Sequence, residues 1–129
     1  MSVDYNFIHI DVDVEFKSVE EKNDALKNFN ARLKKYNMDA EEQGIATLPL
    51  VAETPDYGQN PERCLNIRCE SDSESYVSDE QAASLITECF PCAHGEIGYA
   101  WATTSSSGYC RECGGGRIKI ENGRYEYVS

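Results

Sequence analysis

Four cysteines form the pattern in this chain that most directly implies chemistry. Cys89 and Cys92 make one Cys-x-x-Cys pair, Cys110 and Cys113 make a second, and 17 residues separate the two pairs. Thiols two residues apart can bind one ion from a tight turn, and a hairpin between the pairs can bring all four together. The spacing predicts a closed, structural Zn²⁺ site at these four residues. Because four thiolates leave no position for water, we expect no enzymatic activity from this site.

The segment 89–117 resembles the cysteine-rich zinc module of DnaJ-type chaperones, which is built from Cys-x-x-Cys-x-Gly-x-Gly repeats. Residues 110–117 match that repeat except that Arg117 replaces its last Gly, and in residues 89–95 the Gly lies one place late. Zinc ribbons in general fit the spacing equally well. The resemblance implies a zinc-held β-hairpin with a surface that binds proteins or peptides. It does not imply chaperone function, because that family has four such repeats and this chain has two.

Other uses of the cysteines stay open at this point. Six cysteines would also suit three disulfides, which need an oxidising compartment. Residues 1–5 show no secretory signal, so we expect a protein of the cytoplasm, or of the host cytoplasm if the chain is viral. A thiol–disulfide enzyme places its Cys-x-x-Cys at the start of a helix, whereas Cys89 is expected at a helix end.

Cys64 and Cys69 lie outside the two pairs. Their odd separation places them on opposite faces of a short strand, which favours two buried thiols. The alternative is a second metal site completed by His9 or His94.

His94 also invites an enzymatic interpretation. With Glu96 it forms the H-x-E motif that zinc deaminases combine with a later P-C-x-x-C. Here Cys110 follows Glu96 closely, and Tyr109 stands where that family has proline. The remaining alternative is that His94 replaces one cysteine as a zinc ligand.

The elements that must position these residues can be placed from hydrophobic periodicity, capping boxes and turn formers. In the first half of the chain we expect a strand at 7–16, a helix at 19–36 that stops at Asn37, and strands at 45–52 and 64–69. In the second half we expect a helix between Ser78 and Cys89 and a strand or hairpin arm at 95–103. Two strands at 117–121 and 124–128, joined by an Asn-Gly turn, follow. This order predicts one α+β domain, 1–129, with a ferredoxin-like βαββαβ antiparallel sheet and a C-terminal hairpin. The zinc hairpin, 89–113, is expected as an insertion before the fourth strand. A zinc ribbon appended to a different α+β core is the alternative.

The first strand alternates strictly between apolar and polar residues. Its polar face carries His9, Asp11, Asp13 and Glu15. We expect a solvated face whose neighbours supply Lys or Thr partners, with a cation site as the alternative.

The acidic charge bears most directly on function. The chain carries 23 acidic and 12 basic residues, a net charge of −11, concentrated before residue 89. A field of this sign repels nucleic acid and attracts basic protein surfaces. The sequence therefore predicts a small acidic interaction module that binds, and in one extension inhibits, a basic or nucleic-acid-handling partner, as anti-defence inhibitors such as anti-CRISPR proteins do.

Aromatic and acidic residues near the cysteine segment are the candidates for partner binding: Tyr99, Trp101, Tyr109, Asp72, Glu74, Asp79 and Glu80. Two alternatives remain. One is a zinc ribbon that binds nucleic acid through basic and aromatic residues, namely Arg111, Arg117, Lys119, Arg124, Tyr125 and Tyr127. The other is a zinc-dependent enzyme.

Overall fold

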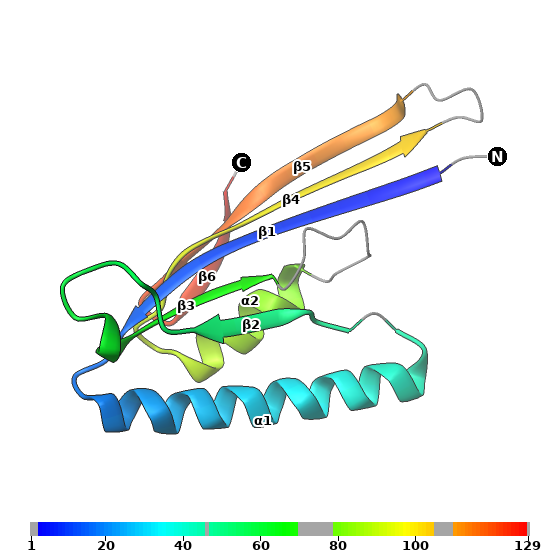
Figure 1. Ribbon diagram of the computed structural model, residues 1–129. Coiled ribbons are helices and arrows are strands. Elements are labelled where there is room, and N and C mark those ends of the chain that lie inside the picture. The colour runs from blue at the N-terminus through cyan, green and yellow to red at the C-terminus, as the bar shows by residue number, and fades with distance from the viewer. Residues whose placement is uncertain (1–2, 46, 70–78, 105–109, 129) are drawn as a thin grey trace.

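Helices and strands are mixed along the chain, and together they form α+β structure (Figure 1). The computed structural model describes residues 3–45, 47–69, 79–104 and 110–128. The elements are β1 (Val3–Glu15), α1 (Val19–Gln43), β2 (Leu50–Glu53), a 3₁₀ turn (Pro61–Arg63), β3 (Cys64–Cys69), α2 (Asp79–Cys89), β4 (His94–Thr104), β5 (Cys110–Glu121) and β6 (Arg124–Val128). The predicted α+β class is confirmed. Neither helix within these ranges is long and apolar enough to cross a membrane.

The strands form one antiparallel sheet in the order β2-β3-β1-β4-β5-β6. β1 lies inside it and pairs with β4 from Val3 opposite Thr104 to Asp13 opposite His94. Residues 94–104 are therefore a strand of the main sheet, where the sequence predicted the arm of an inserted hairpin. The strand that was expected fourth, 117–121, lies one position further out as part of β5.

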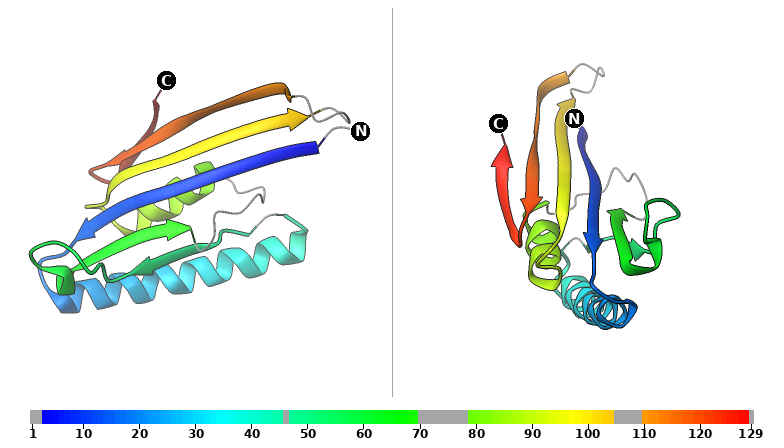
Figure 2. Two further views of the ribbon diagram at one scale, coloured as in Figure 1. Left: turned by 45° about the horizontal axis from the view of Figure 1, so that its top comes forward. Right: turned by 90° about the vertical axis from the view of Figure 1, so that its left-hand side faces the viewer.

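Both helices pack on the same face of the sheet (Figure 2). Four apolar residues of β1 point to this face and are at most 5% exposed: Ile8, Ile10, Val12 and Val14. Neighbouring elements complete the core with Phe29, Leu65, Ile67, Ala82, Ala83, Ile86, Phe90, Ile97, Ile118 and Ile120. The opposite side, called the open face below, carries the polar residues of the same strands and is not covered by either described helix.

Helix α1 begins as predicted but ends later. Ser18 Oγ accepts a hydrogen bond from Glu21 N at 3.1 Å, and Gly44, with a φ of 71°, provides a left-handed C-cap. Asn37, predicted to stop the helix, lies inside it. Its Oδ1 accepts from Leu48 N at 2.7 Å and its Nδ2 donates to Leu48 O at 3.1 Å. This side chain fastens the segment before β2 to the helix.

The C-terminal hairpin has the predicted turn. Asn122 and Gly123 have φ angles of 51° and 74°, the left-handed values that a two-residue type I′ turn requires. The turn sets the register of β5 and β6, with Glu121 opposite Arg124.

Candidate binding surface

The two cysteine pairs lie at opposite ends of the β4–β5 ladder. Cys92 precedes β4, whereas Cys113 is opposite Ala102, near the far end of that strand. The path from His94 to Ala102 spans about 27 Å of extended chain, and a Zn–S bond is about 2.3 Å long. In the part of the chain that the structure describes, no group of three or more His, Cys, Asp or Glu side chains could hold a metal ion. The prediction of a zinc-binding, zinc-ribbon protein is therefore wrong.

The length of β4 explains this error. A zinc hairpin must fit both of its arms between the two cysteine pairs, so that the second pair returns to the first. Here the linker contains only one arm, β4, and Cys110 begins the return strand instead of ending it. The glycines at 114–116, predicted to bend the backbone around sulfur, lie inside the continuous strand β5.

The first Cys-x-x-Cys pair belongs to the end of α2 and the turn that follows. Cys89 is 7% exposed, and Arg32 Nη1 donates a hydrogen bond to its Sγ at 3.6 Å. Burial raises the pKa of the Cys89 thiol, and Arg32 opposes part of that shift. Cys92 is exposed, and both cysteines are free thiols. A neutral, buried thiol is a poor nucleophile, so Cys89 does not suit the role of an attacking thiol.

A chelator is expected to leave this fold unchanged. Excess EDTA should not alter the melting temperature or the far-ultraviolet circular dichroism, because the β4–β5 ladder holds the segment without metal. The double variant Cys110→Ser, Cys113→Ser should likewise have the same melting temperature as the wild type. A stoichiometric zinc ion in native mass spectrometry, lost together with folded structure on chelation, would contradict this expectation.

The remaining cysteines and histidines do not converge either. Cys64 and Cys69 lie on opposite faces of β3, as their odd spacing predicts. Both are half-buried, where two buried thiols were expected, and Cys69 packs against the core. Burial is the main cause that raises the pKa of Cys64. His9 and His94 are exposed on the open face. Since no described ligand group forms around them, a second metal site and a deaminase-like centre at His94 and Glu96 lack support.

The aromatic residues predicted to bind a partner differ in their surroundings. Tyr99 is half-buried: its ring lies over Gly116 and meets Tyr127 edge to face, with ring centroids 6.3 Å apart. It therefore serves in packing at the margin of the core. Trp101 lies further along β4, and only its backbone position is described. Tyr109 lies outside the described residues.

The predicted acidic contacts are only partly described. Glu80 is exposed in the first turn of α2, and Asp79 is the first residue of that helix. A carboxylate in the first turn suits the positive end of the helix dipole, so a local structural role accounts for Glu80. Asp72 and Glu74 lie outside the described residues.

The basic and aromatic residues of the last hairpin occupy different faces. Arg117 and Lys119 are exposed on the open face, and each forms an ion pair with a neighbouring glutamate, at 3.6 and 3.1 Å. Tyr125 and Tyr127 are opposite buried isoleucines of β5, which places them on the helix-covered face. The pattern that suggested stacking on single-stranded nucleic acid is therefore divided between two surfaces. The side chain of Arg111 lies outside the description.

Three carboxylates follow one another along the open face of β1. Asp11, Asp13 and Glu15, called the β1 acidic row below, occupy alternate positions about 7 Å apart. Asn66 Nδ2 on β3 donates to Asp11 Oδ1 at 3.1 Å and to Asp13 Oδ1 at 3.0 Å. Tyr57, in the loop after β2, donates its hydroxyl to Asp13 Oδ1 at 3.0 Å. Neutral donors thus hold two of these carboxylates in place without removing their charge.

The charge balance of the open face is uneven. Arg68, Arg117 and Lys119 each pair with a glutamate. None of the ion pairs found among the described side chains includes a member of the β1 acidic row. The expected lysine or threonine partners are replaced by Asn66 and Tyr57, so the row keeps its negative field. Tyr57 remains 56% exposed beside it.

Asn66 and Tyr57 are absent from the candidates that the sequence suggested. Asn66 occupies a polar position of an alternating strand, and only the pairing of β1 with β3, with Asp13 opposite Asn66, identifies it as a donor to the row. Tyr57 lies among turn formers in the segment 54–61, where an aromatic residue is a weak signal by itself. Partial desolvation of the hydroxyl, followed by its hydrogen bond to Asp13, raises the pKa of Tyr57, so the hydroxyl is a donor at neutral pH.

Comparison with protein-family models, with curated proteins and with solved structures found no match to this chain. The inference of function therefore begins from the geometry and charge of the open face.

Proposed function

We propose that this protein is an acidic interaction module that binds a basic surface of another protein through the open face of its sheet. The observation that carries the proposal is the β1 acidic row, in which Asn66 and Tyr57 hold Asp11 and Asp13 in fixed positions and whose members form none of the ion pairs found among the described side chains. Binding, and not catalysis, is the role that we assign to it.

Electrostatics supports a cationic partner. The chain has a net charge of −11, so its long-range field accelerates the approach of basic proteins and opposes the approach of nucleic acid. The nearby basic side chains Arg68, Arg117 and Lys119 already have glutamate partners. The carboxylates that can pair with a lysine or arginine of a partner are therefore those of the β1 acidic row.

The geometry suits arginine and lysine side chains in particular. The row presents one carboxylate about every 7 Å, which is the spacing of alternate side chains on an extended segment. The exposed Tyr57 ring lies beside Asp13 and offers a face for a cation–π contact. Proteins that handle nucleic acid carry such cations for phosphate binding, and we propose a partner of this class, which the module would inhibit by occupying its cationic groove.

We further propose that the first six elements, β1 to β4 with α1 and α2, have a ferredoxin-like arrangement. The support is the position of β1 between β3 and β4, with β2 outside β3 and every neighbour antiparallel. In this arrangement β5 and β6 extend the sheet beyond β4.

Neutralising the row is expected to weaken binding to a basic probe. We would titrate a fluorescent oligo-arginine peptide with the wild type and with the triple variant Asp11→Asn, Asp13→Asn, Glu15→Gln. The loss of three exposed ion pairs should weaken binding about tenfold at moderate salt, since each contributes about 0.5 kcal/mol. Circular dichroism would verify that the variant folds.

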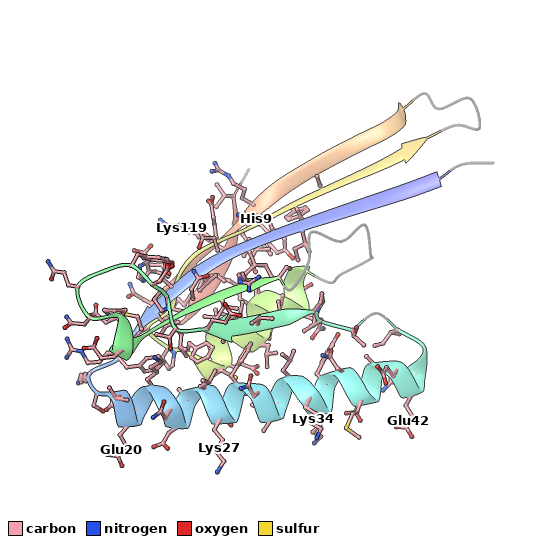
Figure 3. The ribbon with its side chains drawn as sticks, in the orientation of Figure 1. His9, Glu20, Lys27, Lys34, Glu42 and Lys119 are labelled. Atoms are coloured by element: carbon pink, nitrogen blue, oxygen red, sulfur yellow. The ribbon has the colours of Figure 1, made fainter. Side chains whose placement is uncertain are left out.

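A matched control separates the row from the overall charge. The triple variant Asp24→Asn, Asp39→Asn, Glu42→Gln removes the same charges from exposed positions on α1. Figure 3 shows Glu42, together with Glu20, Lys27 and Lys34, on the side of α1 that points away from the sheet. The α1 variant should bind within about twofold of the wild type. An equal loss in both triple variants would mean that the peptide senses only net charge, which would refute the proposed site.

A further inference from the structure

The outer edge of β5 is unpaired along half of its length. β6 pairs with β5 only from Arg117 to Glu121, while β4 pairs with β5 from Cys110 to Ile120, with a register shift at Cys110–Glu112 opposite Thr103 and Thr104. No other described strand lies beyond β5 at Cys110–Gly116. Figure 2 shows β6 ending partway along β5, so that β5 continues past it as the border of the sheet. Along this border, backbone N–H and C=O groups face solvent and can accept another strand.

Apart from the register shift at Cys110–Glu112, this edge lacks the features that protect sheet edges from pairing. Residues 110–116 contain no proline and no lysine, and their two charges, on Arg111 and Glu112, have opposite signs. Three consecutive glycines complete the segment, and Gly114 and Gly115 are exposed. Because glycine has no side chain, a second backbone can approach here without steric hindrance.

The charge distribution selects a second copy of this chain as the occupant. Residues 89–129 contain four acidic and four basic residues, so the entire net charge of −11 belongs to residues 1–88. A basic partner is attracted to the charged part, whereas two copies can meet at the neutral part without strong repulsion. Identical strands that pair antiparallel also form a closed twofold interface, the commonest symmetry of homodimers.

We propose that two copies associate by antiparallel pairing of their β5 edges, centred on Cys113. This register uses the unpaired edge on both sides of Cys113, with Cys113 opposite Cys113 of the second copy and the regular part of the strand, Glu112–Gly116, at its centre. Glu112 then lies opposite Gly114, and Arg111, at the register shift, lies near Gly115, so no charged residue faces a like charge. The two sheets become one continuous sheet, and the β1 acidic row of each copy remains accessible.

The register makes a prediction about cross-linking. Residues directly opposite each other in an antiparallel pair have Cα atoms about 4.5–5.5 Å apart, within the range of a disulfide. Cys110 of one copy lies about 20 Å from Cys110 of the other, six residues along the strand. We would prepare two variants that each retain one β5 cysteine, with the other replaced by serine, and oxidise both with diamide, which takes up the two hydrogens lost per disulfide. The Cys113-only protein should give a covalent dimer on a non-reducing gel, and the Cys110-only protein should remain monomeric.

The mass in solution gives the second test, without oxidant. Light scattering after gel filtration of the reduced wild type, over a concentration series, should show the mass rising toward that of a dimer. Cys113→Lys places two lysines opposite each other at the twofold axis and should abolish the dimer, whereas Cys110→Lys should retain it. A wild type that stays monomeric, or a dimer that survives Cys113→Lys, would overturn the proposal. So would cross-linking through Cys110 that equals cross-linking through Cys113. A monomer would leave the binding test on the β1 acidic row unaffected.

Discussion

Replacing Gly95 with alanine is expected to lower the free energy of unfolding by about 3 kcal/mol. Gly95 is the second residue of β4 and has a φ of 151°, a conformation that L-residues rarely adopt. An added Cβ would lie 2.2 Å from Asp11 O and 2.7 Å from Val12 Cα. Both are backbone atoms of the inner strand β1, so rotation of a side chain cannot relieve the clash. The melting temperature should fall by on the order of 10 °C.

Gly98 supplies the matched control on the same strand. A Cβ added there meets no atom within 4 Å, so Gly98→Ala should change stability by no more than about 0.5 kcal/mol. Urea denaturation of both variants would measure the difference. If Gly95→Ala proved as stable as Gly98→Ala, the close approach of β4 to β1 at this point would be incorrect, and with it the placement of residues 94–104 in the main sheet.

Phe90→Ala is expected to cost about 3–5 kcal/mol of stability, the usual range for truncating a buried phenylalanine. Phe90 lies within the first Cys-x-x-Cys motif and is fully buried. Its ring centroid is 5.1 Å from that of Phe29 on α1 and 6.2 Å from that of Phe16 after β1. These contacts join the end of α2 to α1 and to the sheet, so truncation leaves a cavity where three segments meet.

A substitution of Cys92, two residues after Phe90, tests whether packing or metal binding stabilises this turn. Cys92 is exposed, and Cys92→Ser should change the free energy of unfolding by at most about 0.5 kcal/mol. Thermal melts of Phe90→Ala and Cys92→Ser would show whether the aromatic residue or the thiol matters at this turn. A large loss in Cys92→Ser with little effect of Phe90→Ala would reverse our assignment.

Local signals in the sequence predicted local structure well. The alternation in β1, the Ser18 capping box and the Asn122–Gly123 turn each depend on neighbours within a few residues, and each has the expected conformation. The two faces of β3 follow in the same way from the alternation of its residues. The α+β class could be predicted because it is the sum of such elements.

Features that depend on distant residues could not be predicted in this way. Asn37 resembles a helix stop until Leu48 provides backbone partners for its side chain. The spacing of the two cysteine pairs suits a zinc site until the pairing of β4 with β1 shows that the linker is a single long strand. The β1 acidic row appeared in the sequence as a polar strand face. Its neutral donors became identifiable only through the loop that carries Tyr57 and the register that places Asn66 opposite Asp13.

The most direct test of the proposed function is to locate the bound probe on the folded protein. Amide ¹H–¹⁵N spectra of the isotope-labelled wild type would be recorded during a titration with the oligo-arginine peptide, and the shift of each amide mapped on the sheet. We predict that the largest shifts occur at residues 11–15, at Asn66 and at Tyr57, and that added salt reverses them. Shifts that gather on α1, or that spread evenly over the acidic residues, would contradict the assignment of the β1 acidic row as the binding site.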